Sequence, residues 1–194
     1  MIREKRYLVN EIFVCYYGKT MDVTLLTVGS LKLKGKKASV IVDPKEKMPK
    51  NQADLVLFLN NVHDVSKVEE VRLIVEDDGE YEVGGIKVTG RGKQDKGISY
   101  SLNIDNINTI LAKVSALEKT TETGSEADLA ILDVDSELNE SLIASIEAKV
   151  VALYGEKAQE GIKALGKDVA PTKKLTIAKD KLPEGSEIQV VWLA

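Results

Sequence analysis

The chain has 194 residues, which is enough for one domain with a substantial core. Its hydrophobic share of 43%, charged share of 30% and net charge of −4 are typical of a globular protein of the cytoplasm, and no apolar run is long enough to cross a bilayer. One cysteine, Cys15, and one histidine, His63, exclude an intrachain disulfide framework and a zinc site of the usual histidine and cysteine ligands.

Residues 1–20 differ from the rest of the chain, because they hold four of its nine aromatic residues. The segment begins with basic residues, but neither a long apolar stretch nor a small-residue cleavage site follows, so a secretory signal is not expected. We predict that residues 1–20 are a peripheral extension and that residues 21–194 form a single domain.

From residue 21 onward the sequence predicts a series of hairpins. SLKLKGKKASVIVDP, residues 30–44, alternates in hydrophobicity and turns at Gly35. The apolar residues 55–59 predict a buried strand, and residues 63–71 predict a short helical turn after it. Gly84-Gly85 and Asp105-Asn106 predict the tight turns of two further hairpins, because such turns need residues that tolerate positive φ.

The pattern of apolar residues changes after residue 126. DLAILDV is continuously apolar, which is typical of a strand covered on both faces. The next segment predicts a helix with Leu138 and Ile146 on its apolar side, capped by Ser136 or Asn139. KVVALY predicts another buried strand, and EKAQEGIKALG predicts a helix that ends at Gly166. KKLTIA and EIQVVWLA predict two final strands, so that a β-α-β-α-β order follows the hairpins.

This order of elements resembles that of a metallo-β-lactamase-fold protein, and most closely the ascorbate-phosphate lactonase-like branch of small metal-dependent hydrolases. The resemblance rests on VIVDP, DLVLFL, DGEYEVGGIKVTG, DLAILDV, KVVALY and LPEGSEIQVVWL, which follow one another in that order. It covers residues 21–194. It implies an α/β (α+β) fold, a four-layer αββα sandwich whose active site lies at one edge between the two sheets.

The resemblance also implies where metal ligands would lie, and most of them are missing. The positions of this chain that fall on the family's ligands are Asn60, Val62, Asp64, Val65, Lys113, Ala116 and Gly155 or its neighbour. The first four fall on the motif His-x-His-x-Asp-His, in which only Asp64 matches. Lys113 and Ala116 replace a later His and Asp, and Gly155 replaces the final His. The family's metal site is therefore degenerate in this sequence.

A hydrolase of this kind uses its metal ion to convert bound water into hydroxide near neutral pH. Valine offers no lone pair, an ammonium group repels a cation, and one carboxylate does not hold zinc. We therefore predict no catalytic residue, no metal and no cofactor. The expected function is that of a non-catalytic relative, or pseudoenzyme, acting as a binding or assembly module. The alternative is a hydrolase of the same superfamily with an active site rebuilt from Asp64, His63, Lys113 or Asp133.

Other features point to partners only weakly. Residues 31–50 carry a charge of +5 and residues 118–147 a charge of −8. We interpret them as two solvated faces, with head-to-tail self-association into a homo-oligomer as the sharper alternative. The lysine-rich segment lacks aromatic residues on which bases could stack, so nucleic acid is not an expected partner. Residues 133–137 resemble the start of a calcium loop but lack its glycine and its final glutamate, and residues 90–93 are a weak phosphate motif.

Overall fold

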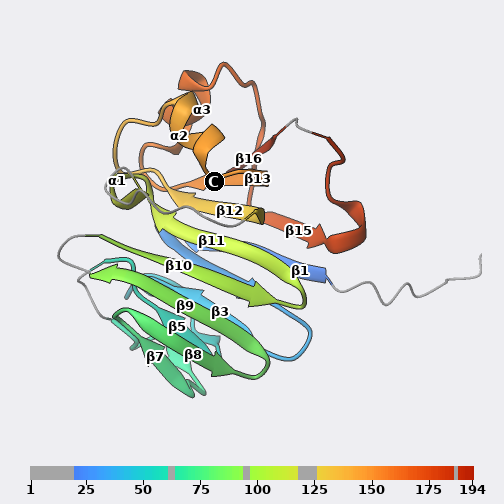
Figure 1. Ribbon diagram of the computed structural model, residues 1–194. Coiled ribbons are helices and arrows are strands. Elements are labelled where there is room, and N and C mark those ends of the chain that lie inside the picture. Colours follow the sequence, from blue (N-terminus) through green and yellow to red (C-terminus); the bar gives the residue numbers. More distant parts are fainter. Residues whose placement is uncertain (1–19, 61–63, 94–96, 118–125, 186–187) are drawn as a thin grey trace, which may run out of the picture.

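The computed structural model describes residues 20–60, 64–93, 97–117, 126–185 and 188–194. Two β-sheets pack face to face, and helices lie over one of them (Figure 1). This mixed arrangement of mostly strands with few helices confirms the predicted fold class. Thr20 belongs to the first strand, although it was included in the predicted extension, and residues 1–19, the rest of that segment, lie outside the described part of the chain.

The first sheet has six strands in the order β15-β1-β2-β3-β5-β7. Their bounds are β1 (Thr20–Thr27), β2 (Ser30–Lys34), β3 (Ser39–Val42), β5 (Leu55–Leu57), β7 (Leu73–Val75) and β15 (Lys174–Ala178). Strands β15, β1, β2 and β3 are antiparallel neighbours, whereas β3, β5 and β7 are parallel. The last strand but one of the chain thus returns to pair with the first.

The second sheet has eight strands in the order β14-β16-β13-β12-β11-β10-β9-β8. Their bounds are β8 (Gly79–Val83), β9 (Ile86–Lys93), β10 (Gly97–Ile104), β11 (Ile107–Lys113), β12 (Ala127–Asp133), β13 (Ala148–Tyr154), β14 (Pro171–Thr172) and β16 (Gln189–Leu193). Strands β8 to β11 form an antiparallel meander, and β11, β12, β13 and β16 are parallel. All seven residues of β12 are buried, as its continuous apolar run predicts.

The predicted tight turns are confirmed by the backbone. Gly84 and Gly85 have φ of +59° and +83° between β8 and β9, and Asp105 and Asn106 have φ of +53° and +69° between β10 and β11. The helical turn predicted after β5 is wrong. Its described part contains a single hydrogen-bonded turn and then β6 (Val68–Glu69), because these residues instead pair with β4 (Asn51–Gln52) in a small parallel sheet.

Two apolar cores hold the layers together. The larger one fills the space between the sheets, where Tyr100 of the second sheet donates a hydrogen bond of 3.1 Å to the carbonyl of Phe58 at the end of β5. The smaller one lies on the outer face of the second sheet, under α1 (Val114–Leu117), α2 (Glu140–Ser145) and α3 (Ala158–Ala164). Asn139 caps α2 by accepting a hydrogen bond of 2.8 Å from the Leu142 amide, as predicted.

The outer face of the six-stranded sheet is covered differently. Met48 and Ala53 pack on Ile41 there, so the chain between β3 and β5 supplies this layer together with the small β4-β6 sheet. Among the described residues, the three α-helices therefore all lie on the eight-stranded sheet. The remaining helical element is the short 3₁₀ turn η1 (Lys179–Lys181), which follows β15. No described helix is long and apolar enough to cross a membrane.

Candidate functional site

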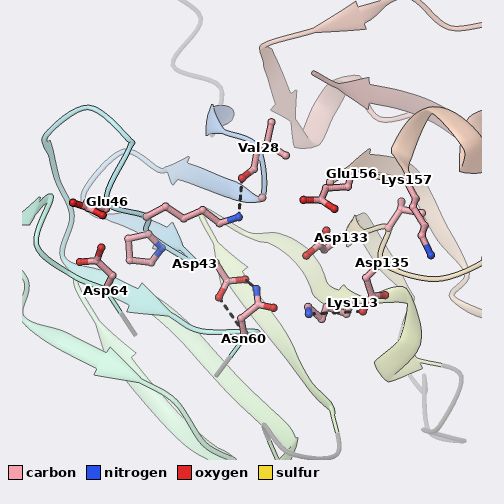
Figure 2. Close-up of a pocket in the computed structure, with 15 residues that line it drawn as sticks. Val28, Asp43, Glu46, Asn60, Asp64, Lys113, Asp133, Asp135, Glu156 and Lys157 are labelled. Atoms are coloured by element: carbon pink, nitrogen blue, oxygen red, sulfur yellow. Dashed lines mark hydrogen bonds and ion pairs between the residues drawn. The ribbon is translucent and has the colours of Figure 1, made fainter. Parts of the chain in front are cut away.

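A cavity of about 560 Å³ opens where several strands end at one edge of the sandwich (Figure 2). The end of β11 and the segments that follow β1, β3, β5, β12 and β13 contribute to it, so both sheets form its walls. Its lining residues are Val28, Gly29, Asp43, Pro44, Lys45, Glu46, Asn60, Asp64, Lys113, Asp133, Val134, Asp135, Gly155, Glu156 and Lys157. Charged and amide groups from segments far apart in the sequence therefore meet in one place.

Three side chains form a row at the ends of the parallel strands of the second sheet. Lys113 of β11 lies opposite Asp133 of β12, and Asp133 lies opposite Tyr154 of β13. Paired residues on neighbouring strands point to the same face, and Leu111 and Ile131, two residues earlier, belong to the core between the sheets. The row therefore faces the space between the two sheets, at the cavity.

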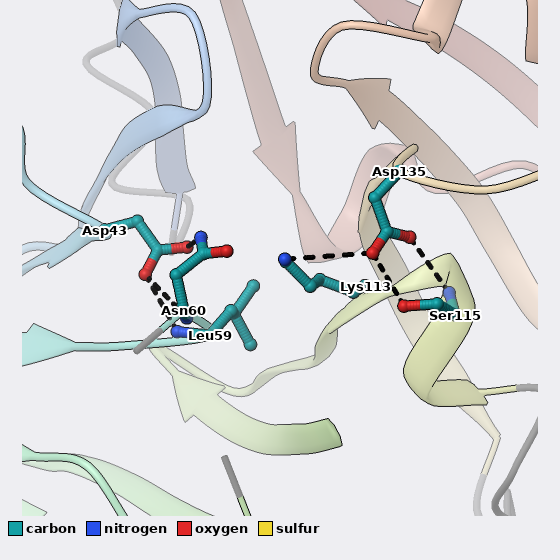
Figure 3. A network of polar contacts seen from close by, with 6 residues as sticks. All are labelled: Asp43, Leu59, Asn60, Lys113, Ser115 and Asp135. Atoms are coloured by element: carbon teal, nitrogen blue, oxygen red, sulfur yellow. Dashed lines mark hydrogen bonds and ion pairs between the residues drawn. The ribbon is translucent and has the colours of Figure 1, made fainter. Parts of the chain in front are cut away.

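The ammonium group of Lys113 lies between carboxylates of both sheets (Figure 3). Its Nζ is 3.7 Å from Oδ2 of Asp135, on one side, and Asp43 with Asn60 lies on the other. Ser115 fixes Asp135 by donating hydrogen bonds from its amide, at 3.0 Å, and from its hydroxyl, at 2.6 Å. Lys113 thus supplies a positive charge between carboxylates that reach the cavity from both sheets.

Asp43 follows β3 and is buried, with 2% of its surface exposed. Its Oδ1 accepts hydrogen bonds from the amides of Leu59 and Asn60, at 2.9 and 3.2 Å, and its Oδ2 accepts one of 2.6 Å from the Asn60 side chain. Burial raises the pKa of Asp43, although these hydrogen bonds and the charge of Lys113 act in the opposite direction. Through its hydrogen bonds to Leu59 and Asn60, the Asp43 carboxylate holds the segment after β5 in place.

Asp133 is also largely buried but lacks such hydrogen-bond partners. Only 9% of its surface is exposed, and no residue in the described part of the chain donates a hydrogen bond to its carboxylate or forms an ion pair with it. Burial raises the pKa of Asp133 to about 6, with Lys113 opposing the shift and Asp43 and Asp135 adding to it. The neighbouring Gly155 makes this position available, because a Cβ on Gly155 would collide with Oδ1 of Asp133.

Tyr154 completes the row as a fully buried residue. Among the described residues its hydroxyl has no hydrogen-bond partner. Burial raises the pKa of Tyr154 well above its ordinary value, and the carboxylates of Asp133, Asp43 and Asp135 add to that effect. A neutral hydroxyl donor and a carboxylate acceptor therefore lie on neighbouring strands, at paired positions, and no hydrogen bond joins them.

The structure brings four of the predicted positions together, since Asn60, Asp64, Lys113 and Gly155 all line the cavity. Asp64 lies near Glu46, away from Lys113 and Asp133 (Figure 2), and accepts a hydrogen bond of 2.9 Å from the Ser66 amide; hydrogen bonding to Ser66 lowers the pKa of Asp64.

Two of the predicted positions lie elsewhere. Ala116 is buried in α1 and faces Gly97, and Val65 is on the surface; neither lines the cavity. Val62 and His63 lie outside the described residues.

Sequence reasoning did not single out Asp43 or Tyr154 as site residues, and it considered Asp135 only as part of the calcium-like segment 133–137. Asp43 carries a recognisable signal, because it directly follows the buried strand VIV. The roles of Asp135 and Tyr154 at this cavity carry no comparable signal. Their relation to Lys113 depends on strand register and on the course of the chain after β12.

The side chains at this site do not fit a catalytic transition metal. Zinc and iron sites of hydrolases use imidazole and carboxylate ligands with free lone pairs. Here the Asp43 oxygens already accept three hydrogen bonds, and the Lys113 ammonium group occupies the space between Asp43 and Asp135. Among the described residues no three His, Cys, Asp or Glu side chains are grouped so that they could hold a metal ion.

Comparison with solved structures agrees with the architecture. A Thermotoga maritima protein assigned to the Zn-dependent hydrolases of the metallo-β-lactamase superfamily superposes with a TM-score of 0.67 at 16% identity, over 90% of this chain and all of that one. A Parabacteroides distasonis protein assigned as a metal-dependent hydrolase gives a TM-score of 0.54 at 18% identity, over 91% and 94% of the two chains. A metallo-β-lactamase-fold protein of Bacillus subtilis gives 0.52 at 11% identity, over 82% and 100%.

At these identities the comparisons show that the chain has the metallo-β-lactamase fold. No family model matches the sequence, and no curated protein sequence matches it. The chemistry of the site must therefore be argued from its own side chains.

Proposed function

We propose that this protein is a metal-independent, non-catalytic relative of the metallo-β-lactamase-fold hydrolases, and that the cavity at its sheet edge serves as a binding or assembly site. The observation that carries the proposal is the position of Lys113. Its ammonium group lies between Asp135 and Asp43, on the side of the cavity where both sheets end. A fixed positive charge there disfavours a metal cation between these two carboxylates and offsets part of the negative charge of the cavity.

Degeneracy of the ligand set supports the same proposal. The resemblance to the lactonase-like branch aligns the ligand positions with Asn60, Lys113 and Gly155, which line the cavity but are poor metal ligands in these roles. Asn60 donates its side-chain amide to Asp43, and Gly155 has no side chain. The scaffold is thus kept while the groups that would activate water are replaced.

Metal analysis of the purified full-length protein tests the proposal. Protein from cells grown with added zinc, iron or manganese is expected to retain far less than one metal ion per chain after gel filtration. Assays with phosphodiester, lactone and ester substrates are expected to show no turnover, with or without added metal. Stoichiometric zinc or iron, together with turnover that a chelator removes, would overturn the proposal.

One observation favours a second candidate, a metal-independent hydrolase with a rebuilt site. Asp133 has a pKa raised to about 6, which suits a general base near neutral pH, and the neighbouring Lys113 could offset the charge that develops on a substrate oxygen. Turnover that survives chelation and disappears in Asp133→Asn would favour this candidate. Asp64→Ala is a weaker test, because Asp64 lies away from Asp133 and Lys113 and accepts a hydrogen bond from Ser66.

Assembly and location belong to the same proposal. Oppositely charged segments, residues 31–50 and 118–147, motivate self-association, and we propose a cytoplasmic homo-oligomer as one form of the assembly. Light scattering at low and high ionic strength tests it, because an electrostatic association should weaken as salt screens the charges.

A further inference from the structure

The unsatisfied carboxylate of Asp133 points to the kind of ligand that the cavity takes. A carboxylate withdrawn from water normally has an ion-pair partner or several hydrogen bonds, because its desolvation is costly. Asp133 is 91% buried, since 9% of its surface is exposed, and it lines the cavity. No described residue donates a hydrogen bond to it, and the nearest lysine, Lys113, pairs with Asp135 instead.

The balance of charge in the cavity favours a cationic ligand. Its lining includes six acidic residues and three lysines: Asp43, Glu46, Asp64, Asp133, Asp135, Glu156, Lys45, Lys113 and Lys157. Two of the lysines are engaged, since Lys113 faces Asp135 at 3.7 Å and Lys45 donates a hydrogen bond of 2.9 Å to the carbonyl of Val28. An anionic ligand would meet this excess of carboxylates, whereas a cation would reduce their mutual repulsion.

The three-donor geometry of a primary ammonium group suits this position. It can pair with the Asp133 carboxylate and keep two N–H groups for other acceptors in the cavity. Figure 2 shows Asp133 directed toward the space between Asp43 and Glu156, with Lys113 beside it. The volume of about 560 Å³ accommodates a small organic molecule and lies within the usual range for such sites.

We propose that the cavity binds the primary ammonium group of a small organic amine, with Asp133 as its ion-pair partner. This inference rests on the proposed binding function and names the chemical class of its ligand. Gly155 contributes by leaving room for the Asp133 carboxylate, which a side chain at that position would displace.

Binding of an ammonium group competes with a proton for Asp133. The amine requires the ionised carboxylate, so its affinity is expected to be constant above pH 7 and to fall as the pH drops through about 6, the pKa of Asp133 in the folded protein. The titratable groups around Asp133 on the neighbouring elements are Lys113, Asp135, Asp43, Lys45, Tyr154 and Glu156. Of these, Asp43 also has a raised pKa, and its protonation would weaken binding in the same direction.

Isothermal titration calorimetry of the full-length protein with three four-carbon probes tests the proposal. The probes are 1,4-diaminobutane, the uncharged 1,4-butanediol and the dianion succinate, at pH 7.5. We expect saturable binding of the diamine only. Asp133→Asn, which keeps the side-chain shape, should weaken that binding at least tenfold, and lowering the pH to 5 should weaken it as well.

Asp168→Asn is the matched control, because it removes the same charge from an exposed residue that does not line the cavity. It should leave the diamine affinity within twofold of the wild type. Absence of saturable diamine binding, or equal weakening by both variants, would overturn the inference. The proposed function is tested separately, by metal analysis and turnover assays. A negative calorimetric result therefore overturns the ammonium-binding inference without overturning the proposed function.

Discussion

Replacing Gly155 with alanine tests whether the backbone at the end of β13 is adapted to hold Asp133. Gly155 has φ of +97°, a conformation that L-residues rarely adopt, and a Cβ there would collide with Oδ1 of Asp133 and lie 3.2 Å from the amide nitrogen of Val134. The conformational strain costs about 1–3 kcal/mol. Displacing a buried side chain to relieve the collision adds roughly another 1–3 kcal/mol. We therefore expect Gly155→Ala to lower the free energy of unfolding by about 2–6 kcal/mol.

Gly185 provides a matched control for this substitution. It has φ of +96°, but a Cβ at Gly185 would meet nothing within 4 Å. Gly185→Ala should therefore show the conformational cost alone, about 1–3 kcal/mol. Equilibrium unfolding in urea measures both variants, and their m values should equal that of the wild type.

A double-mutant cycle identifies the colliding group. Asp133→Ala removes the carboxylate, so in that background the cost of Gly155→Ala should fall toward that of Gly185→Ala. The reasoning would be refuted if Gly155→Ala cost no more than Gly185→Ala in the wild-type background, or if removing the Asp133 side chain did not reduce the cost.

Three further predictions concern the polar groups of the site and the core. Folding raises the pKa of Asp133 from 3.8 to about 6, so the folded protein binds the proton more tightly than the unfolded chain does. This contribution to the free energy of unfolding is fully present below about pH 4 and is lost as the pH rises through about 6. The loss is up to about 3 kcal/mol. Asp133→Asn should therefore be more stable than the wild type at pH 8 and should flatten the pH profile of urea unfolding; an unchanged profile would contradict the shift. Lys113→Met should lower the free energy of unfolding by about 1–3 kcal/mol, because it leaves ionised carboxylates without their cation, and the loss should be larger at pH 8 than at pH 5. The control Lys157→Met, at an exposed residue of the cavity lining, should lower it by less than about 0.5 kcal/mol. Among the buried tyrosines, Tyr100→Phe should cost about 1 kcal/mol in thermal or urea unfolding, because it loses the hydrogen bond to Phe58, while Tyr154→Phe should cost nothing; similar losses in both would show that Tyr154 has a partner.

Several parts of the site could be predicted from the sequence, and for identifiable reasons. Asn60 and Asp64 follow a buried apolar strand, and Gly155 follows another, so the resemblance in element order places them at the same edge. The resemblance places Lys113 at a ligand position, and Lys113 lines the cavity. It places Ala116 at another ligand position, but the short helix α1 begins at Val114 and turns Ala116 away into the core beside β10.

The roles of these residues could not be predicted in the same way. Asp133 and Asp135 are two residues apart in a sequence that suits a helix start, yet one is an unpaired buried carboxylate and the other is held by Ser115 and Lys113. That difference depends on burial and on the course of the chain after β12, neither of which follows from residue type. The layer over the six-stranded sheet likewise depends on the pairing of β4 with β6, two strands too short to leave a periodic signal.

The amino-acid sequence by itself determined the hairpins, the buried strands, the helix after residue 136 with two candidate caps, and the scarcity of metal ligands, because periodicity, turn residues and composition are local properties. The tertiary structure alone decided that Lys113, Asp133 and Tyr154 stand in register and face Asp43 across the gap between the sheets. Electrostatic energy depends on the separation and burial of charges, and both are set by long-range packing.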